Sequence, residues 1–506
     1  MPFGKFKINL LKIKKAEDLI NFFQTRNISN KRIPAHKIFH SLIRQDHETT
    51  ILEVNFSKTY ELFYHYINEC KDYGSDPSDS AKIFHFFDGG YDSIDELIEK
   101  KDTLIYLGFC IFRPDWSISY SLISEKIIIR EKDHYAFLVN KITSKTEIVK
   151  GLSVSVSGFP YIEKDNGIVM CAQAVLATIA DYWNNKENRQ IFSVTTASAI
   201  SLEAGVLTEE IKPDSRRGLT IQEINNCLKK MNIPFKTQNY FTLTQEMIKS
   251  ARPETNIYGF FESGWPILCI VKAGKQFHAI SVIGHTFDRN NWLAMADIGY
   301  YHRPLSGDGQ YHSNMAWIRN FIIHDDNFGP YLFIPWEKFA EILVAYVVIL
   351  PSSSIKITPL QSERIAYIAL KEFAKLYRNL LDTNEIKGDD ILWARQFCEH
   401  TSNLVLRPLF IKTSDLLKRY ANHEFFSTVK RIIEQQNKLE WLSIVEISWP
   451  EIYCYQRMKI GLVVINPDSN EVLMIHLPKC LIVRNDNYYL TDKHDPIRAH
   501  EAPAGN

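Results

Sequence analysis

Cys171 stands at the start of a segment with helical periodicity, and this placement constrains the fold more than any other feature of the sequence. The segment CAQAVLATIADYW (171–183) repeats apolar residues along one helix face. Further along the chain, the apolar strand pattern FHAISVIGH (277–285) opens with a histidine. A third segment, FIIHDDNFGPY (321–331), ends a strand pattern on two acids. The order predicts a helix that carries a thiol, followed by strands that carry an imidazole and a carboxylate.

These three residue types are the parts of a nucleophilic Cys-His-Asp site. The thiolate is the reactive form of cysteine, and a helix N-terminus favours it through the helix dipole and the unpaired N–H groups. A neighbouring imidazole forms an ion pair with the thiolate and later protonates the leaving group. An acid on the next strand fixes the tautomer and orientation of the imidazole ring.

Each residue taken singly also has a structural interpretation. A cysteine in an apolar helix is commonly a small core residue, and a histidine at a strand edge is commonly structural. The Asp-Asp-Asn sequence after a strand is typical of a turn. The joint order of the three is what favours the interpretation as a site.

The length of the chain and its periodic patterns predict two or three domains. At 506 residues it is too long for a single hydrophobic core. We expect a mixed α/β domain over 1–150, a central domain over 151–352, and a third domain over 355–506 after the linker sequence PSSS. In the third domain, a helical segment precedes patterns typical of a β-meander, and a single helix is expected over 413–436.

Composition excludes some classes of partner and setting. Lys plus Arg and Asp plus Glu both number 59, so net charge gives no case for nucleic acid or an anionic membrane as the main partner. The most apolar stretch, ILVAYVVIL (342–350), is too short to span a bilayer, and the N-terminal sequence lacks the pattern of a signal peptide. The eight cysteines show no CxxC or other metal-ligand spacing, so we expect no metal or cofactor and a cytoplasmic location. Export without a cleavable signal stays open.

The central block resembles the papain-like cysteine peptidases, in particular the C39-like group related to double-glycine leader peptidases. PYIEKDNGIVMCAQAVLATIADYW is similar to the nucleophile segment of that group, and GLTIQEINNCLKKMNIPFKT to the segment that follows it. WPILCIVKAGKQFHAISVIGH is similar to the hairpin that carries the catalytic histidine, and HDDNFGPYLFIPWEKFAEIL to the strand end that carries the acid. The resemblance covers residues 160–350, and implies an α+β fold with the nucleophile helix packed on an antiparallel sheet.

The resemblance implies a role for individual residues. Cys171 matches the nucleophile, His278 the general base and Asp325 the orienting acid. Asp326 stays open as the acid because it is adjacent. Asp297 stays open because it lies closer to His278 in sequence and also ends a strand-like run.

The sequence departs from the family before the nucleophile. The family has a glutamine there whose side chain helps to form the oxyanion hole, whereas this chain has Glu163, Lys164, Asp165 and Asn166. Asn166 or Lys164 is the candidate replacement, with the Cys171 backbone N–H as the other donor. Loss of one such donor costs about two to three orders of magnitude in rate.

The expected function is that of a cysteine peptidase or isopeptidase, which hydrolyses an amide bond of a peptide or protein through an acyl-thioester on Cys171. A transglutaminase-like acyltransferase or amidase is a second possibility, because it uses the same three side chains. A catalytically inactive papain-like binding module is a third, which the absent glutamine favours. The sequence leaves the roles of 1–150 and 355–506 and the oligomeric state open.

Overall fold

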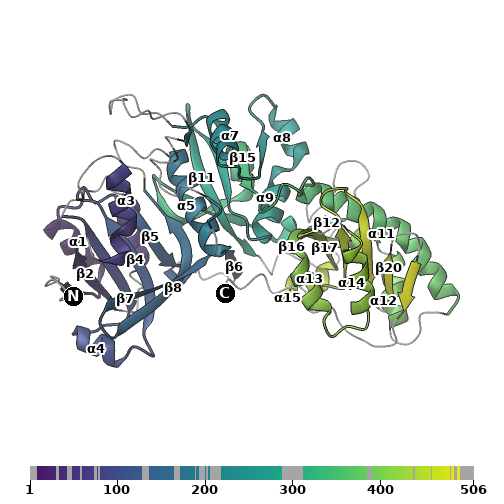
Figure 1. Cartoon of the computed structure of the whole chain (residues 1–506), viewed down its shortest axis with the longest axis horizontal. Helices are drawn as coiled ribbons and strands as arrows, with labels where there is room; N and C mark the ends of the chain where they lie inside the picture. The colour runs from purple at the N-terminus through teal and green to yellow at the C-terminus, as the bar shows by residue number, and fades with distance from the viewer. Residues whose placement is uncertain are drawn as a thin grey trace.

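The protein contains three seven-stranded sheets, which lie in a row along the long axis of the molecule (Figure 1). The structure, a computed structural model, describes residues 8–29, 33–42, 48–56, 60–72, 77, 80–127, 136–163, 171–187, 190–192, 200, 203–204, 218–287, 311–384, 390–399, 401–436, 439–456, 459–478, 480–483 and 487–490. Helices and antiparallel strands are both abundant, so the α+β class is confirmed. In the described residues, no helix combines the length and apolar character needed to cross a membrane.

The first sheet has the strand order β1-β2-β3-β4-β5-β8-β7, and all its neighbours are antiparallel. Its strands are β1 (Ile8–Ile13), β2 (Thr49–Asn55), β3 (Lys82–Asp88), β4 (Ile105–Phe112), β5 (Ile118–Ser124), β7 (Ile142–Val149) and β8 (Leu152–Tyr161). Its helices are α1 (Ala16–Thr25), α2 (Ile33–Leu42), α3 (Tyr64–Asp72) and α4 (Ile94–Glu99). The connections β1–β2, β2–β3 and β3–β4 contain these four helices, so this part of the chain combines helices with a purely antiparallel sheet.

The first sheet continues past residue 150, where we expected a boundary. Strand β8 pairs with both β5 and β7 and ends at Tyr161. Its first half alternates buried Leu152, Val154 and Val156 with exposed serines, the pattern of a strand with one face on a core. The expected boundary therefore falls within the β7–β8 hairpin.

The central sheet has the order β14-β13-β11-β10-β15-β9, and β6 also pairs with β11. Its strands are β6 (Ala136–Val139), β9 (Phe235–Asn239), β10 (Ile267–Ala273), β11 (Gln276–Phe287), β13 (Asn320–Asp325), β14 (Gly329–Pro335) and β15 (Leu343–Ile349). Its helices are α5 (Cys171–Lys186), α7 (Ile221–Lys230), α8 (Gln245–Ala251), α9 (Pro253–Glu262) and α10 (Trp336–Ile342). The expected helix with the thiol is α5, whose buried residues run from Ala172 to Trp183 and which packs on β10 and β11.

The third sheet has the order β12-β16-β17-β18-β19-β20-β21, so β16 to β21 follow one another as in a meander. Its strands are β12 (His312–Ser313), β16 (Val405–Lys412), β17 (Trp441–Ser448), β18 (Gly461–Ile465), β19 (Val472–Leu477), β20 (Cys480–Val483) and β21 (Asn487–Leu490). Its helices are α11 (Pro359–Asp382), α12 (Asp390–Glu399), α13 (Thr413–Tyr420), α14 (Phe426–Glu434) and α15 (Pro450–Gln456). The single helix expected over 413–436 was wrong, because a turn separates α13 from α14 and the His423 side chain accepts the N–H of Phe425 there.

Buried charged side chains join the central and third sheets. Glu262, at the end of α9, accepts hydrogen bonds from Arg407 of β16 and from the hydroxyl of Tyr258, and lies 2.6 Å from His285 of β11. Arg407 also donates to Glu446 of β17 at 2.9 Å. The side chains of Glu262, His285 and Arg407 are at most 1% exposed. The third sheet is therefore fixed to the central sheet through its interior.

Candidate functional site

The candidate site lies at one end of the central sheet, where three elements bring together Cys171, His278 and Asp325. Cys171 is the first residue of α5, His278 lies near the start of β11, and Asp325 is the last residue of β13. Strands β11 and β13 are antiparallel neighbours, with Ser281 opposite His324. This register brings the start of β11 beside the end of β13, as antiparallel pairing requires.

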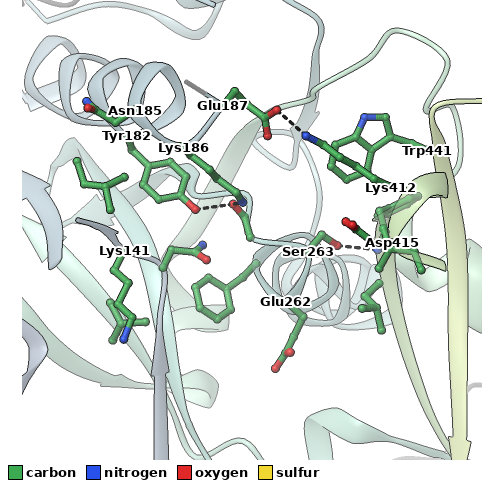
Figure 2. A pocket seen from close by; sticks show the side chains of 18 of the residues that line it. Lys141, Tyr182, Asn185, Lys186, Glu187, Glu262, Ser263, Lys412, Asp415 and Trp441 are labelled. Atoms are coloured by element: carbon green, nitrogen blue, oxygen red, sulfur yellow. Dashed lines mark hydrogen bonds and ion pairs between the residues drawn. The ribbon is translucent and has the colours of Figure 1, made fainter. Parts of the chain in front are cut away.

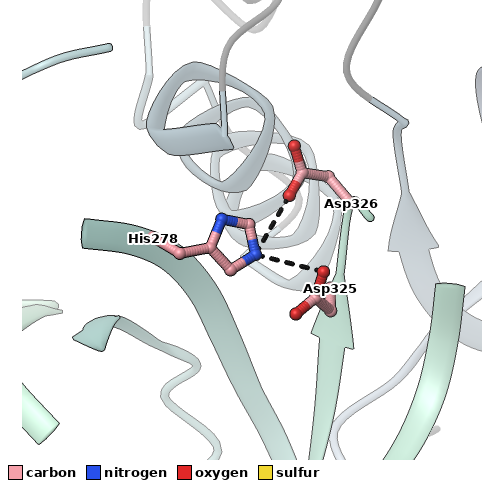
Figure 3. Close-up of side chains that lie close together, drawn as sticks. All are labelled: His278, Asp325 and Asp326. Atoms are coloured by element: carbon pink, nitrogen blue, oxygen red, sulfur yellow. Dashed lines mark ion pairs between the residues drawn. The ribbon is translucent and has the colours of Figure 1, made fainter. Parts of the chain in front are cut away.

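Both expected acids contact the same nitrogen of the His278 ring. The Nε2 atom lies 3.1 Å from Oδ1 of Asp325 and 3.3 Å from Oδ1 of Asp326, as the dashed lines in Figure 3 show. The exposed fractions of the three side chains are 11% for His278, 9% for Asp325 and 2% for Asp326. The ring is therefore held by two carboxylates in a largely enclosed environment.

The thiol of Cys171 acts on His278 through a side-chain interaction that helps to raise the pKa of the imidazole. Both carboxylates lie at Nε2, and Figure 3 shows Nδ1 directed away from the two acids. Burial by itself lowers the pKa of His278, but the side-chain interactions with Asp325 and Cys171 and the charges of Asp325 and Asp326 raise it to about 10. An imidazolium at neutral pH is the form that stabilises a neighbouring thiolate.

Cys171 differs from the other cysteines of the described chain. It is half-buried, whereas the other described free cysteines are buried. Burial raises the pKa of the thiols of Cys110, Cys227, Cys269, Cys398 and Cys480. A buried thiol with a raised pKa is a poor nucleophile, so the geometry singles out Cys171 as the reactive thiol.

Hydrogen bonds hold Asp325 both at its carboxylate and at its backbone carbonyl. Its Oδ1 accepts the N–H groups of Asn327 at 2.8 Å and Phe328 at 3.2 Å, which is the arrangement of an Asx turn. Its backbone carbonyl accepts the hydroxyl of Tyr161 at 3.1 Å. Tyr161 is the last residue of β8, so the first sheet takes part in holding the acid.

Asn327 is a site residue that sequence reasoning missed. Its side-chain nitrogen lies 3.3 Å from Nε2 and 3.5 Å from Nδ1 of His278. The only sequence signal was its place in the Asp-Asp-Asn run, which is equally typical of an ordinary turn. Only the pairing of β11 with β13 brings this amide to the ring.

Three expected site residues lie outside the described residues. Lys164 and Asn166, the candidate oxyanion donors, fall in 164–170, and Asp297, the alternative acid, falls in 288–310. They stay predictions from the sequence alone. Of the three candidate acids, Asp325 and Asp326 are those that the structure brings to His278.

The same histidine and acids also form a possible set of metal ligands. One ligand atom each from His278, Asp325 and Asp326 lies within 4.8 Å of the other two. Imidazole and carboxylate donors suit divalent cations such as Zn²⁺ and Mn²⁺. The sequence analysis expected no metal from the spacing of the cysteines and did not consider these three residues together as ligands.

Comparison with known proteins adds no family assignment: no protein-family model matches the chain, and no curated protein matches it significantly. The proposals below therefore depend on the residues and their geometry.

Proposed function

We propose that the protein is a cysteine peptidase or isopeptidase that hydrolyses an amide bond of a peptide or protein substrate through an acyl-thioester on Cys171. The observation that carries the proposal is the continuous contact from Cys171 through His278 to Asp325. A helix with the nucleophile on an antiparallel sheet that carries the base and acid is also what the resemblance to papain-like, C39-like peptidases implies.

Each residue has a defined part in the proposed reaction. The Cys171 thiolate attacks the amide carbon, a C–S bond forms, and the carbonyl electron pair moves onto oxygen. The His278 imidazolium gives its proton to the amide nitrogen, which leaves as an amine when the C–N bond breaks. Water then attacks the thioester, His278 takes one of its protons, and the thiolate leaves. Asp325 holds the ring and stabilises its charged form.

Two N–H donors are expected to stabilise the oxyanion. The backbone N–H of Cys171, at the free end of α5, is one expected donor. The second expected donor is Asn166 or Lys164, as proposed from the sequence. A site with one donor fewer would turn over about two to three orders of magnitude more slowly.

The proposal is tested by alkylating the purified protein with iodoacetamide from pH 5 to 9 and locating the adduct by mass spectrometry. We expect Cys171 to react fastest of the cysteines at pH 6, and its rate to fall at least tenfold in His278→Ala. His423→Ala, a half-buried histidine in the turn after α13, is the matched control and should leave the rate unchanged. Labelling of Cys171 that is no faster than that of the buried thiols, with no effect of His278→Ala, would favour a catalytically inactive binding module.

Acyl transfer to an amine is the related alternative, since it begins with the same thioester. A transglutaminase-like enzyme would pass the acyl group to an added primary amine in preference to water. Product analysis with and without a primary amine such as glycine ethyl ester separates the two outcomes once a substrate is in hand.

A divalent metal site is a second candidate function, favoured by the approach of Asp325 and Asp326 to the same atom of His278. An orienting acid requires one carboxylate, whereas a metal site uses several. In this alternative His278 and the acids would be ligands, and the metal would act on the substrate as a Lewis acid.

A further inference from the structure

A cavity of about 570 Å³ lies where the three sheets meet, at the other end of α5 from Cys171. Its wall includes Asn140 and Lys141 from the β6–β7 connection, the end of α5, the end of α9, and residues of β16, α13 and β17. Figure 2 shows Lys141, Lys186 and Lys412 on different sides of this space. The cavity is therefore separate from the candidate site, and residues from all three sheets and their helices line it.

Lys186, the last residue of α5, places an ammonium group in the cavity with few partners. It donates to the backbone carbonyl of Gly264 at 2.6 Å, and this carbonyl also accepts the hydroxyl of Tyr182. Its Nζ lies 5.4 Å from the ring centroids of Tyr182 and Trp183. Among the described residues, no carboxylate lies within ion-pair distance of Lys186, although an ammonium has three N–H donors.

Lys186 is an exposed residue whose ammonium group faces the cavity. Loss of solvent around the ammonium lowers the pKa of Lys186, the charge of Glu187 opposes this shift and the charge of Lys412 adds to it, so that the pKa is about 8. Glu187 is itself paired with Lys412 at 2.8 Å, which leaves less of its charge for Lys186. An anion in the cavity would stabilise the ammonium at this position.

The other charged groups of the wall already have partners: Lys141 is paired with Glu125 at 2.7 Å, Lys412 with Glu187 at 2.8 Å, and Asp415 with Lys418 at 3.1 Å. Glu262 is already engaged by Arg407 and His285, so this carboxylate is not available to Lys186. Arg419 also lines the cavity, 3.6 Å from Glu446. Among the described residues of the wall, Lys186 is therefore the cation that an anionic ligand would pair with.

Two further groups suit an organic ligand. The indole ring of Trp441 lines the cavity and offers an apolar surface. The Lys412 ammonium lies over this ring, 5.7 Å from the ring centroid. The side-chain nitrogen of Asn140, a buried residue of the wall, has no hydrogen-bond partner among the described residues. A buried N–H donor without a partner costs free energy. If the Asn140 side chain turned toward the cavity, an acceptor atom of the ligand would supply the missing hydrogen bond.

We propose that this cavity binds a small organic anion, with Lys186 as the direct partner of its phosphate or carboxylate and Trp441 as the contact of its apolar part. The volume is within the range of cavities that hold small molecules. This site does not depend on the proposed peptidase function, because its residues lie at the far end of α5 and outside the Cys171–His278–Asp325 contact.

The test is isothermal titration calorimetry on the full chain with two probes, adenosine 5′-monophosphate and citrate, and with adenosine as the neutral control. We expect saturable binding of at least one anionic probe, none of adenosine at the same concentration, and a rise in Tm with the bound probe. A phosphate ester is indicated if the nucleotide binds, and a carboxylate if citrate binds.

Variants locate the bound probe. Lys186→Met should weaken binding at least tenfold, Lys186→Arg should retain most of it, and Lys338→Met, at an exposed lysine of α10, should leave it unchanged. In the unaltered protein, the probe should also slow reductive methylation of Lys186, which does not require a folded variant. The absence of saturable binding by both anions, or binding that is unchanged in Lys186→Met, would overturn the proposal.

Discussion

The hydroxyl of Tyr161 donates to the backbone carbonyl of Asp325 at 3.1 Å, so a strand of the first sheet holds the acid of the candidate site in the central sheet. Both residues are buried, and the bond joins positions that are 164 residues apart in the chain. The first sheet therefore contributes to the geometry of the candidate site, although the sequence alone leaves the role of residues 1–150 open.

The removal of the Tyr161 hydroxyl should disturb the site more than the fold. In Tyr161→Phe, the loss of one buried hydrogen bond should lower the free energy of unfolding by about 1 kcal/mol. Because the carbonyl of Asp325 loses its support, the alkylation rate of Cys171 should also fall several-fold. Tyr331→Phe, which removes a hydroxyl bonded to Ile123 and Phe159 in the same interface, should cost similar stability and leave the rate unchanged. Equal rates in the two variants would contradict a positioning role for Tyr161.

The two acids should be unequal. Asp325→Asn should lower the alkylation rate of Cys171 at pH 6 by about two orders of magnitude, because the orienting acid of a triad has effects of at least that size. Asp326→Asn should lower it less than tenfold, since Asp325 is closer to Nε2 and is fixed by two backbone N–H groups. A larger effect of Asp326→Asn would make Asp326 the orienting acid.

The raised pKa of His278 predicts how stability depends on pH. In the folded protein this pKa is about 10, against 6.5 for an ordinary histidine. Because the folded value is the higher one, the stabilisation is fully present below about pH 6.5 and is lost as the pH rises to about 10. The difference in unfolding free energy between the unaltered protein and His278→Gln should therefore shrink from pH 6.5 to pH 10, by at most about 5 kcal/mol. Urea unfolding of both proteins at pH 6.5, 8 and 10 measures this difference in free energy. A free-energy difference that does not change with pH would show that the imidazole is not held as a cation.

Metal removal separates the two candidate functions. If the site acts through the Cys171 thiolate, dialysis against EDTA should leave the alkylation rate of Cys171 unchanged, and added Zn²⁺ should slow alkylation by binding the imidazole and the two carboxylates. Elemental analysis of the purified protein provides the second readout. One equivalent of a divalent metal that is lost together with activity on EDTA treatment, and restored with it, would support the metal site instead.

The buried charges between the central and third sheets should be sensitive to single substitutions. Glu262→Gln leaves Arg407 without one of its two carboxylates, and the removal of one partner of a buried pair costs about 3 to 5 kcal/mol. Glu341→Gln, in an exposed pair with Lys338, should cost less than about 1 kcal/mol. Thermal unfolding of both variants measures the contrast, and equal losses would mean that the buried pair adds little to the attachment of the third sheet.

Local patterns in the sequence were sufficient to place the candidate site on its elements. Apolar periodicity predicted the helix that begins at Cys171, and strand patterns placed His278 near the start of β11 and Asp325 at the end of β13. These predictions hold because the periods of helices and strands are local properties that a burial pattern reveals. The same patterns predicted a helical segment followed by meander-like strands in the third domain, where the structure has α11 and the strands β17 to β19.

Only the tertiary structure decided which distant segments meet. The first sheet takes in β8 and ends at Tyr161, β6 joins the central sheet, and the Asn327 amide reaches the ring of His278 because β13 pairs with β11. The ion pairs of Glu262 and the cavity around Lys186 arise from the same long-range packing. A residue pattern shows which face of an element is buried, whereas the partner of that face is set by the burial of whole sheets against one another, which the sequence alone did not specify.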